Sequence, residues 1–68
     1  MNLKEAKAAA ERLAPVEYDG VRYERISEVG IHYDRNGKRF DFVTLVQGNT
    51  TVRVQSEKVK ECEQDEVF

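Results

Sequence analysis

Catalytic chemistry in this chain would depend on one histidine and one cysteine, His32 and Cys62. A nucleophilic cysteine needs a base within hydrogen-bond reach and surroundings that favour the thiolate. Nothing in the local sequence brings the two residues together, and the segment around Cys62 is acidic rather than basic. His32 faces Asp41 in the register expected for its hairpin, which suits a surface cross-strand pair better than a general base. We therefore expect no enzymatic activity.

Metal-binding patterns are incomplete as well. One histidine and one cysteine do not supply the four ligands of a structural zinc site. The segment DRNGKRFD offers Asp34, Asn36 and Asp41, but a lysine and an arginine stand where a calcium loop needs an oxygen ligand and a glycine. The four glycines are isolated, so no glycine-rich phosphate loop is formed. We expect neither a metal nor a cofactor.

A basic cluster at a predicted hairpin tip is the best binding candidate. The tentative binding residues are Arg35, Lys38 and Arg39 at the tip, Arg53 on the neighbouring strand, and His32. Tyr33, Phe40 and Phe42 alternate with them, which would suit single-stranded nucleic acid through phosphate contacts and base stacking. The alternative is that these aromatic residues form the core and the charges only solubilise the tip.

Composition limits the classes of function. The 68 residues carry 11 Lys and Arg against 13 Asp and Glu, a net charge of -2, which argues against a strong non-specific nucleic-acid binder. The chain has no apolar run long enough for a membrane span and no signal-peptide pattern, so we expect a cytoplasmic protein. Domains of about this size bury only roughly 60% of their unfolded surface. A protein partner or a second copy of the chain is therefore expected to support the small core.

The elements that must position these residues begin with a helix. Asn2 and Glu5 form a capping-box pair, and Pro15 ends the helical segment. The predicted apolar stripe of this helix consists of Leu3, Ala6, Ala10 and Leu13.

Three hairpins are predicted to follow. A two-residue turn at Asp19-Gly20 pairs Val16 with Tyr23 and Tyr18 with Val21. A two-residue turn at Asn36-Gly37 would pair Tyr33 with Phe40, Ile31 with Phe42, Val29 with Thr44, Asp34 with Arg39 and His32 with Asp41. A third turn near Gly48 places Val52 and Val54 beside Val43 and Leu45, and a bulge is expected near Ser27-Glu28.

The predicted fold is α+β and mainly β. The helix is followed by an antiparallel meander of four to five strands that curls into an SH3-like partial barrel, with a flat sheet as the alternative. Ser56–Lys58 is expected to form one helical turn with Ser56 as its cap, before a short last strand or helical piece that opens at Val59. Residues 1–62 are expected to form one domain, and residues 63–68 an acidic flexible tail.

A family resemblance covers most of residues 3–60. The pattern PVEYDGVRYERI, YDRNGK, LVQGNTTVRV and EKV resembles small uncharacterised proteins encoded in bacterial prophages and other mobile elements. The shared features are Pro15 and Val16, the Tyr18–Gly20 turn, Tyr23 and the valine-rich segment 52–59. The resemblance implies a cytoplasmic phage accessory protein and supplies no functional residue. We expect a non-catalytic interaction module, with a weak single-stranded nucleic-acid binder as the alternative.

Overall fold

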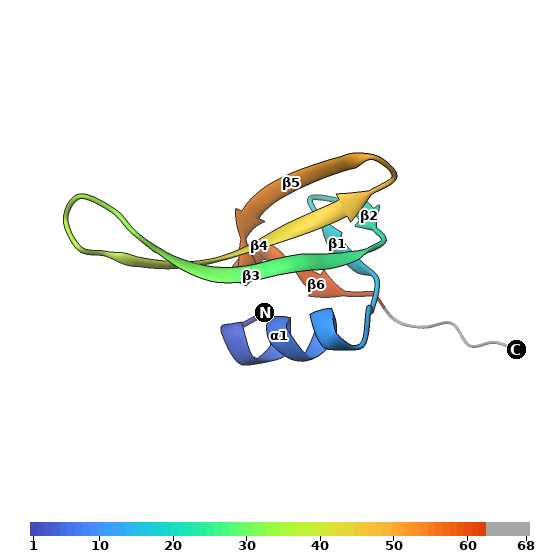
Figure 1. Cartoon of the computed structure of the whole chain (residues 1–68), viewed down its shortest axis with the longest axis horizontal. Helices are drawn as coiled ribbons and strands as arrows, with labels where there is room; N and C mark the ends of the chain where they lie inside the picture. Colours follow the sequence, from blue (N-terminus) through green and yellow to red (C-terminus); the bar gives the residue numbers. More distant parts are fainter. Residues whose placement is uncertain (63–68) are drawn as a thin grey trace, which may run out of the picture.

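The computed structural model describes residues 1–62 and contains one helix and six strands (Figure 1). The elements are α1 (Leu3–Glu11), β1 (Val16–Tyr18), β2 (Val21–Tyr23), β3 (Arg25–Tyr33), β4 (Arg39–Gln47), β5 (Thr50–Gln55), the 3-10 turn η1 (Ser56–Lys58) and β6 (Lys60–Glu61). They form two antiparallel three-stranded sheets, ordered β2-β1-β6 and β3-β4-β5. Within this part of the chain, α1 falls well short of the length and apolarity of a membrane-crossing helix. The acidic tail predicted for residues 63–68 lies outside the described residues.

The predicted capping box of α1 is confirmed. The Asn2 side chain accepts from the Glu5 amide at 2.8 Å, and the Glu5 carboxylate accepts from the Asn2 amide at 2.9 Å. The helix ends at Glu11, ahead of Pro15, because Leu13 enters the left-handed region at φ 56°. This turn lets the Leu13 amide donate to Ala10 and the Ala14 amide to Ala9, which is a Schellman motif.

The left-handed turn also corrects the predicted helix stripe. Leu13 swings out of the helix and is 65% exposed, so it does not continue the apolar face. Ala9 takes its place beside Ala6, and both are fully buried. The predicted stripe was wrong at its end because the helix ends at Glu11, two residues before Leu13.

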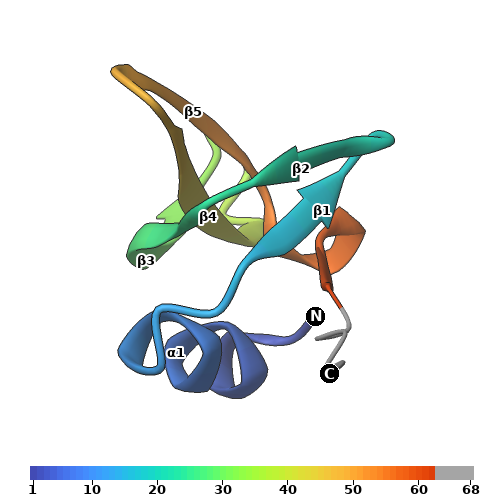
Figure 2. The same cartoon turned by 90° about the vertical axis from the view of Figure 1, so that its right-hand side faces the viewer.

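The Asp19-Gly20 hairpin has the predicted register, with Val16 opposite Tyr23 and Tyr18 opposite Val21. Both turn residues have positive φ, 55° and 78°, as a type I′ turn requires. The expected single meander is corrected at the end of the chain, where β6 returns to pair with β1. Strand β1 is thereby the centre of a separate small sheet. In the view of Figure 2, β1 and β2 lie above α1. In residues 1–62 the two sheets do not close into a barrel.

The β3–β4 hairpin has a different register from the prediction. Tyr33 lies opposite Arg39, His32 opposite Phe40 and Gly30 opposite Phe42. The loop is one residue longer, because the Gly37 amide donates to the Asp34 carbonyl and the Asp34 amide donates to the Lys38 carbonyl, both at 3.0 Å. This is a type I turn followed by Gly37 at φ 80°.

Asp34 explains why the longer loop forms. Its carboxylate accepts from the amides of Asn36 at 2.8 Å and Lys38 at 2.9 Å, the role that aspartate plays at the first position of a type I turn. The predicted pairs of Asp34 with Arg39, of His32 with Asp41 and of Tyr33 with Phe40 are therefore wrong. The observed register instead aligns Val29, Val43 and Val54 across the three strands.

The core lies between α1 and the inner halves of β3 and β4. Its buried members are Ala6, Ala9, Ala14, Val16, Ile26, Val43, Leu45 and Val59. The predicted bulge is present between Ile26 and Glu28, and its extra residue lets both Ile26 and Val29 face the helix. The predicted placement of Val52 and Val54 beside Val43 and Leu45 is confirmed, with Val54 opposite Val43 and Val52 opposite Leu45.

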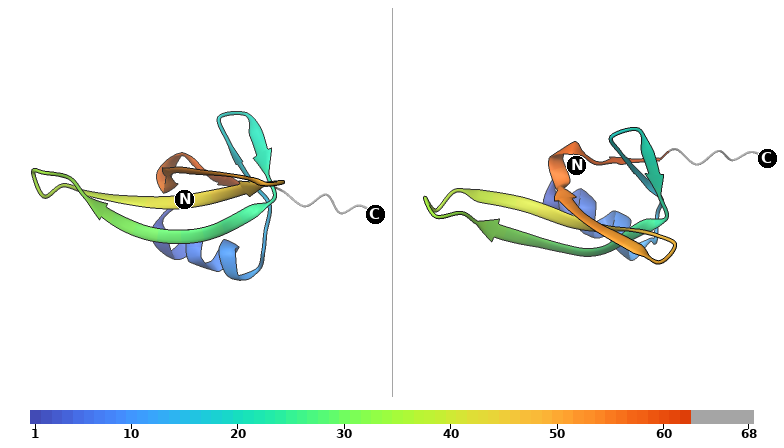
Figure 3. Two further views of the ribbon diagram at one scale, coloured as in Figure 1. Left: turned by 45° about the horizontal axis from the view of Figure 1, so that its top comes forward. Right: turned by 90° about the horizontal axis from the view of Figure 1, so that it is seen from above.

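The outer part of the β3–β4 hairpin projects beyond the rest of the domain (Figure 3). We call residues 31–41 the arm. Strand β5 reaches only as far as Phe42, which pairs with Gln55, so the arm is two strands wide. Ile31 and Tyr33 on the arm are 40% and 61% exposed. The arm is thus held by its own ladder and turn rather than by the core.

The N-terminus is held against the turn η1 and the residue that follows it. The Met1 ammonium donates to the carbonyls of Ser56 at 2.9 Å and Val59 at 3.0 Å. The turn η1 was expected with Ser56 as its cap; Gln55 takes the cap position and Ser56 is buried inside the turn. These contacts tie the two ends of the described chain together.

Candidate functional site

One face of the β3-β4-β5 sheet points away from α1 and carries aromatic and cationic side chains. Strand alternation and the observed register place His32, Phe40, Phe42, Arg53 and Gln55 on this face. We call these five residues, together with Lys38 above Phe40, the Phe face. The alternative in which Phe40 and Phe42 form the core is wrong, because the one-residue longer loop turns them to the opposite side.

Phe42 is fixed at the base of the Phe face by the absence of a side chain at Gly30. A Cβ atom at Gly30 would lie 2.6 Å from the Phe42 ring, so the ring rests directly on the Gly30 backbone. The Arg53 guanidinium lies over the ring, with its Cζ atom 4.3 Å from the ring centroid. This distance is well within the range of a cation–π contact.

Glu28 on β3 holds Arg53 on β5 in place across Thr44 of the intervening strand β4. Its carboxylate is 3.5 Å from an Arg53 nitrogen and accepts a hydrogen bond of 3.0 Å from the Thr44 hydroxyl. Both side chains of the ion pair are more than half exposed, so the pair orients Arg53 more than it stabilises the fold. The carboxylate also offsets much of the local positive charge.

Phe40 forms the outer part of the Phe face. The Lys38 ammonium lies 5.6 Å from its ring centroid. A shallow hollow of about 340 Å³ is lined by His32, Phe40, Phe42, Arg53, Val54 and Gln55. A second hollow of about 320 Å³ continues from Phe40 and Gln55 towards η1, where β5 has ended and β4 has not. The two hollows share Phe40 and Gln55, and Arg39 and Asp41 also line the second.

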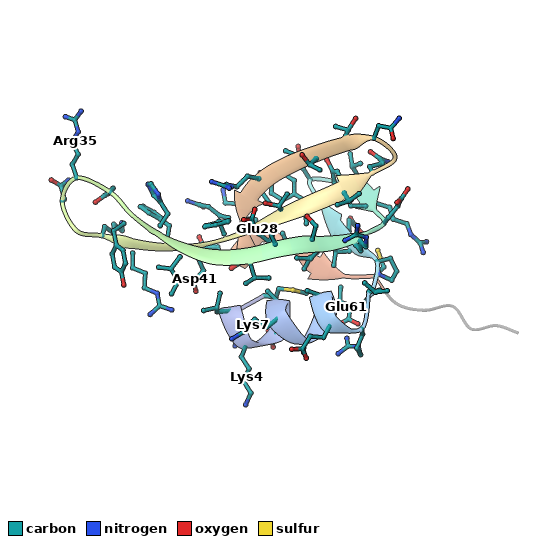
Figure 4. All side chains as sticks on the ribbon, viewed as in Figure 1. Lys4, Lys7, Glu28, Arg35, Asp41 and Glu61 are labelled. Carbon is teal, nitrogen blue, oxygen red and sulfur yellow. The ribbon has the colours of Figure 1, made fainter. Side chains whose placement is uncertain are left out.

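The structure divides the predicted binding residues into three groups. His32, Lys38 and Arg53 come together on the Phe face. Arg39 lies on the opposite face, where its Nε donates to the Asp41 carboxylate at 3.0 Å. Arg35 points away from the tip of the arm, and Asp41 lies on the helix side (Figure 4). The predicted tip cluster of three basic residues is therefore dispersed.

Two members of the site were missed from the sequence. Gln55 was treated only as the end of a strand, although its register with Phe42 places it between the two hollows. Gly30, one of the four isolated glycines, accommodates the Phe42 ring against its backbone. The signal that could have identified it was an in-strand glycine opposite a strand carrying two phenylalanines two residues apart.

The remaining chemistry-bearing residues lie apart. Cys62 donates its amide to the Pro15 carbonyl at the end of the small sheet, whereas His32 is on the arm. Residues 1–62 contain no group of three or more His, Cys, Asp or Glu side chains placed to hold a metal ion. The arrangement on the Phe face can stack planar groups and attract negative charge, and it contains no nucleophile next to a base. Comparison of the chain with family models, with curated proteins and with solved structures gives no match.

Proposed function

We propose that this protein is a small non-catalytic interaction module that binds a protein segment through the Phe face. The observation that carries the proposal is the position of Phe40 and Phe42 on a sheet face that α1 does not cover. The chain has only six aromatic residues, and these two add nothing to its small core. Apolar side chains gathered on an uncovered face commonly mark a binding surface. Aromatic and arginine side chains around a shallow hollow are the composition typical of protein-binding surfaces.

The charge of the Phe face favours a segment with both apolar and acidic side chains. Arg53 and Lys38 are its cations, and Glu28 offsets one of them. The resemblance to prophage-encoded proteins supports assigning the module to a cytoplasmic accessory role. The curl of the larger sheet and the return of β6 to β1 support the comparison with an open SH3-like barrel.

The test is a selection of peptides from a random displayed library, followed by binding measurements with two matched double variants. Lys38→Ser with Arg53→Ser removes two positive charges from the Phe face, and Arg35→Ser with Lys4→Ser removes two exposed ones that line neither hollow. We expect the first variant, and Phe40→Ser, to weaken peptide binding at least about tenfold. The second variant should bind as the wild type does. Equal loss with both double variants would overturn the proposed site.

Single-stranded nucleic acid is the second candidate, because two stackable rings and two cations share the Phe face. Fluorescence anisotropy with labelled single-stranded DNA and RNA distinguishes it from the first. A nucleic-acid site should lose most of its affinity between about 50 and 200 mM salt, since bound phosphates release counterions. No detectable binding at the lower salt concentration would eliminate this candidate.

A further inference from the structure

The outer edge of the larger sheet is formed by β3, which pairs with β4 on one side only. It is nine residues long and contains neither proline nor lysine, the residues that commonly protect such edges. The edge strands of the small sheet, β2 and β6, have only three and two residues. Strand β5 carries mainly polar residues on its exposed positions. Edge protection is therefore weakest along β3.

The register shows which backbone groups of β3 are free. The Asp34 amide bonds to Lys38, and antiparallel alternation then directs the backbone groups of Gly30 and His32 towards β4. Val29, Ile31 and Tyr33 consequently direct their N–H and C=O groups outwards. The side chains of Ile31 and Tyr33 are also among the exposed large apolar groups of the described chain.

We infer that this edge pairs with a second copy of the chain, β3 against β3 in antiparallel orientation, centred on Gly30. In this register Val29 lies opposite the partner's Ile31, and Glu28 lies opposite the partner's His32. Each contact occurs twice because of the two-fold axis. The Glu28 carboxylate can accept from the imidazole, so the cross-strand pairs are complementary.

The neighbouring register is disfavoured by charge. A shift that places Ile31 opposite the partner's Ile31 also places Glu28 opposite the partner's Asp34. Two carboxylates would then face each other twice, which is destabilising in a sheet. The bulge at Ser27 interrupts the regular strand toward the start of β3, so pairing centred on a residue before Gly30 would be irregular. Complementarity therefore selects both a second copy as the occupant and one register.

The two-fold axis also explains why the arm projects past α1. It runs perpendicular to the sheet, so both Phe faces lie on one side of a six-stranded sheet and both helices on the other. Each arm then runs beside the partner's inner β3 residues, on the side where that partner's helix packs. Ile31, which is exposed in the single chain, then lies beside the partner's Val29. In each chain Val29 packs against that chain's own core. The inference makes no assumption about what the Phe face binds, although its Glu28–His32 pairs lie at the border of that face.

Sedimentation equilibrium tests the association. From about 10 µM to about 1 mM, the range suited to a small interface, the mean mass should rise towards twice that of the monomer. Ile31→Lys should raise the dissociation constant at least about tenfold, because it places a charge on the edge. Val21→Lys is the matched control, since Val21 is 42% exposed on the edge of the other sheet, and it should leave the mass unchanged. A wild-type protein that stays monomeric throughout would overturn the inference.

Disulfide trapping tests the register, in a Cys62→Ser background with a mild copper-based oxidant. Directly paired residues have Cα atoms about 5.5 Å apart, within disulfide range, whereas residues two positions off are too distant. Val29→Cys mixed with Ile31→Cys should therefore give a crosslinked heterodimer, and either variant alone should not. Crosslinking of Ile31→Cys with itself would overturn the Gly30-centred register. This measurement also covers the case in which Ile31→Lys fails to fold.

Discussion

The two halves of the β3–β4 hairpin share one ladder and have opposite surroundings. In the inner half, Ile26, Val43 and Leu45 are at most 1% exposed and pack against α1. In the arm, Ile31 and Tyr33 are 40% and 61% exposed, and charged residues alternate with them. The backbone hydrogen bonds are the same in kind, so the difference lies in what the side chains meet. The inner half holds the fold, and the arm carries His32, Lys38 and Phe40, three of the six residues of the Phe face that we propose for binding.

The largest expected difference comes from removing buried volume in the inner half. Leu45→Ala should lower the free energy of unfolding by about 2–5 kcal/mol, because Leu45 is fully buried. Tyr33→Ala on the arm is the control and should change it by less than about 0.5 kcal/mol. Urea unfolding followed by circular dichroism measures both. Similar losses in the two variants would show that the arm is part of the core.

A smaller effect is expected at Gly30, where the two halves meet. Gly30→Ala should lower the free energy of unfolding by about 1–3 kcal/mol, because the added Cβ displaces the Phe42 ring. In a Phe42→Ala background the same change should have little effect, since the obstructing ring is gone. The double-mutant cycle therefore reports the contact itself. An unchanged loss in that background would mean that the ring does not lie on Gly30.

The smallest expected effect is a gain. Leu13→Gly should raise the free energy of unfolding by about 1 kcal/mol, because glycine adopts the left-handed conformation without the Cβ conflict and Leu13 buries little surface. Hydrogen exchange should slow in α1 and the inner half of the hairpin, and stay unchanged in the arm. Arg12→Gly is the control, since Arg12 is right-handed at φ −86° and should gain nothing. Equal gains in both variants would contradict the role of the turn.

Local signals were enough to predict much of the fold. The capping box of α1, the Asp19-Gly20 turn, the bulge near Ser27 and the Val43–Val54 pairing each depend on a few neighbouring residues, and each is confirmed. The return of β6 to β1 was not predictable in the same way. It joins segments more than 40 positions apart through only two residue pairs, and so short a pairing leaves no local sequence pattern.

The candidate site was harder to predict because it depends on one residue of register. Asn36-Gly37 is a strong signal for a two-residue turn, but Asp34 satisfied two loop amides and favoured the longer loop. That single residue moved Phe40 and Phe42 from the helix side to the Phe face. The predicted grouping of the basic residues at the tip was therefore wrong.

The ammonium group of Met1 has a practical consequence for handling the protein. A residue joined ahead of Met1, as in an N-terminal affinity tag, converts the charged donor of two hydrogen bonds into an ordinary amide. The carbonyls of Ser56 and Val59 would then lose a charge-assisted partner, and η1 and β6 would be held less firmly. Expression vectors that place the tag after the last residue leave both hydrogen bonds of the Met1 ammonium intact. Comparisons between preparations should therefore keep the tag position constant.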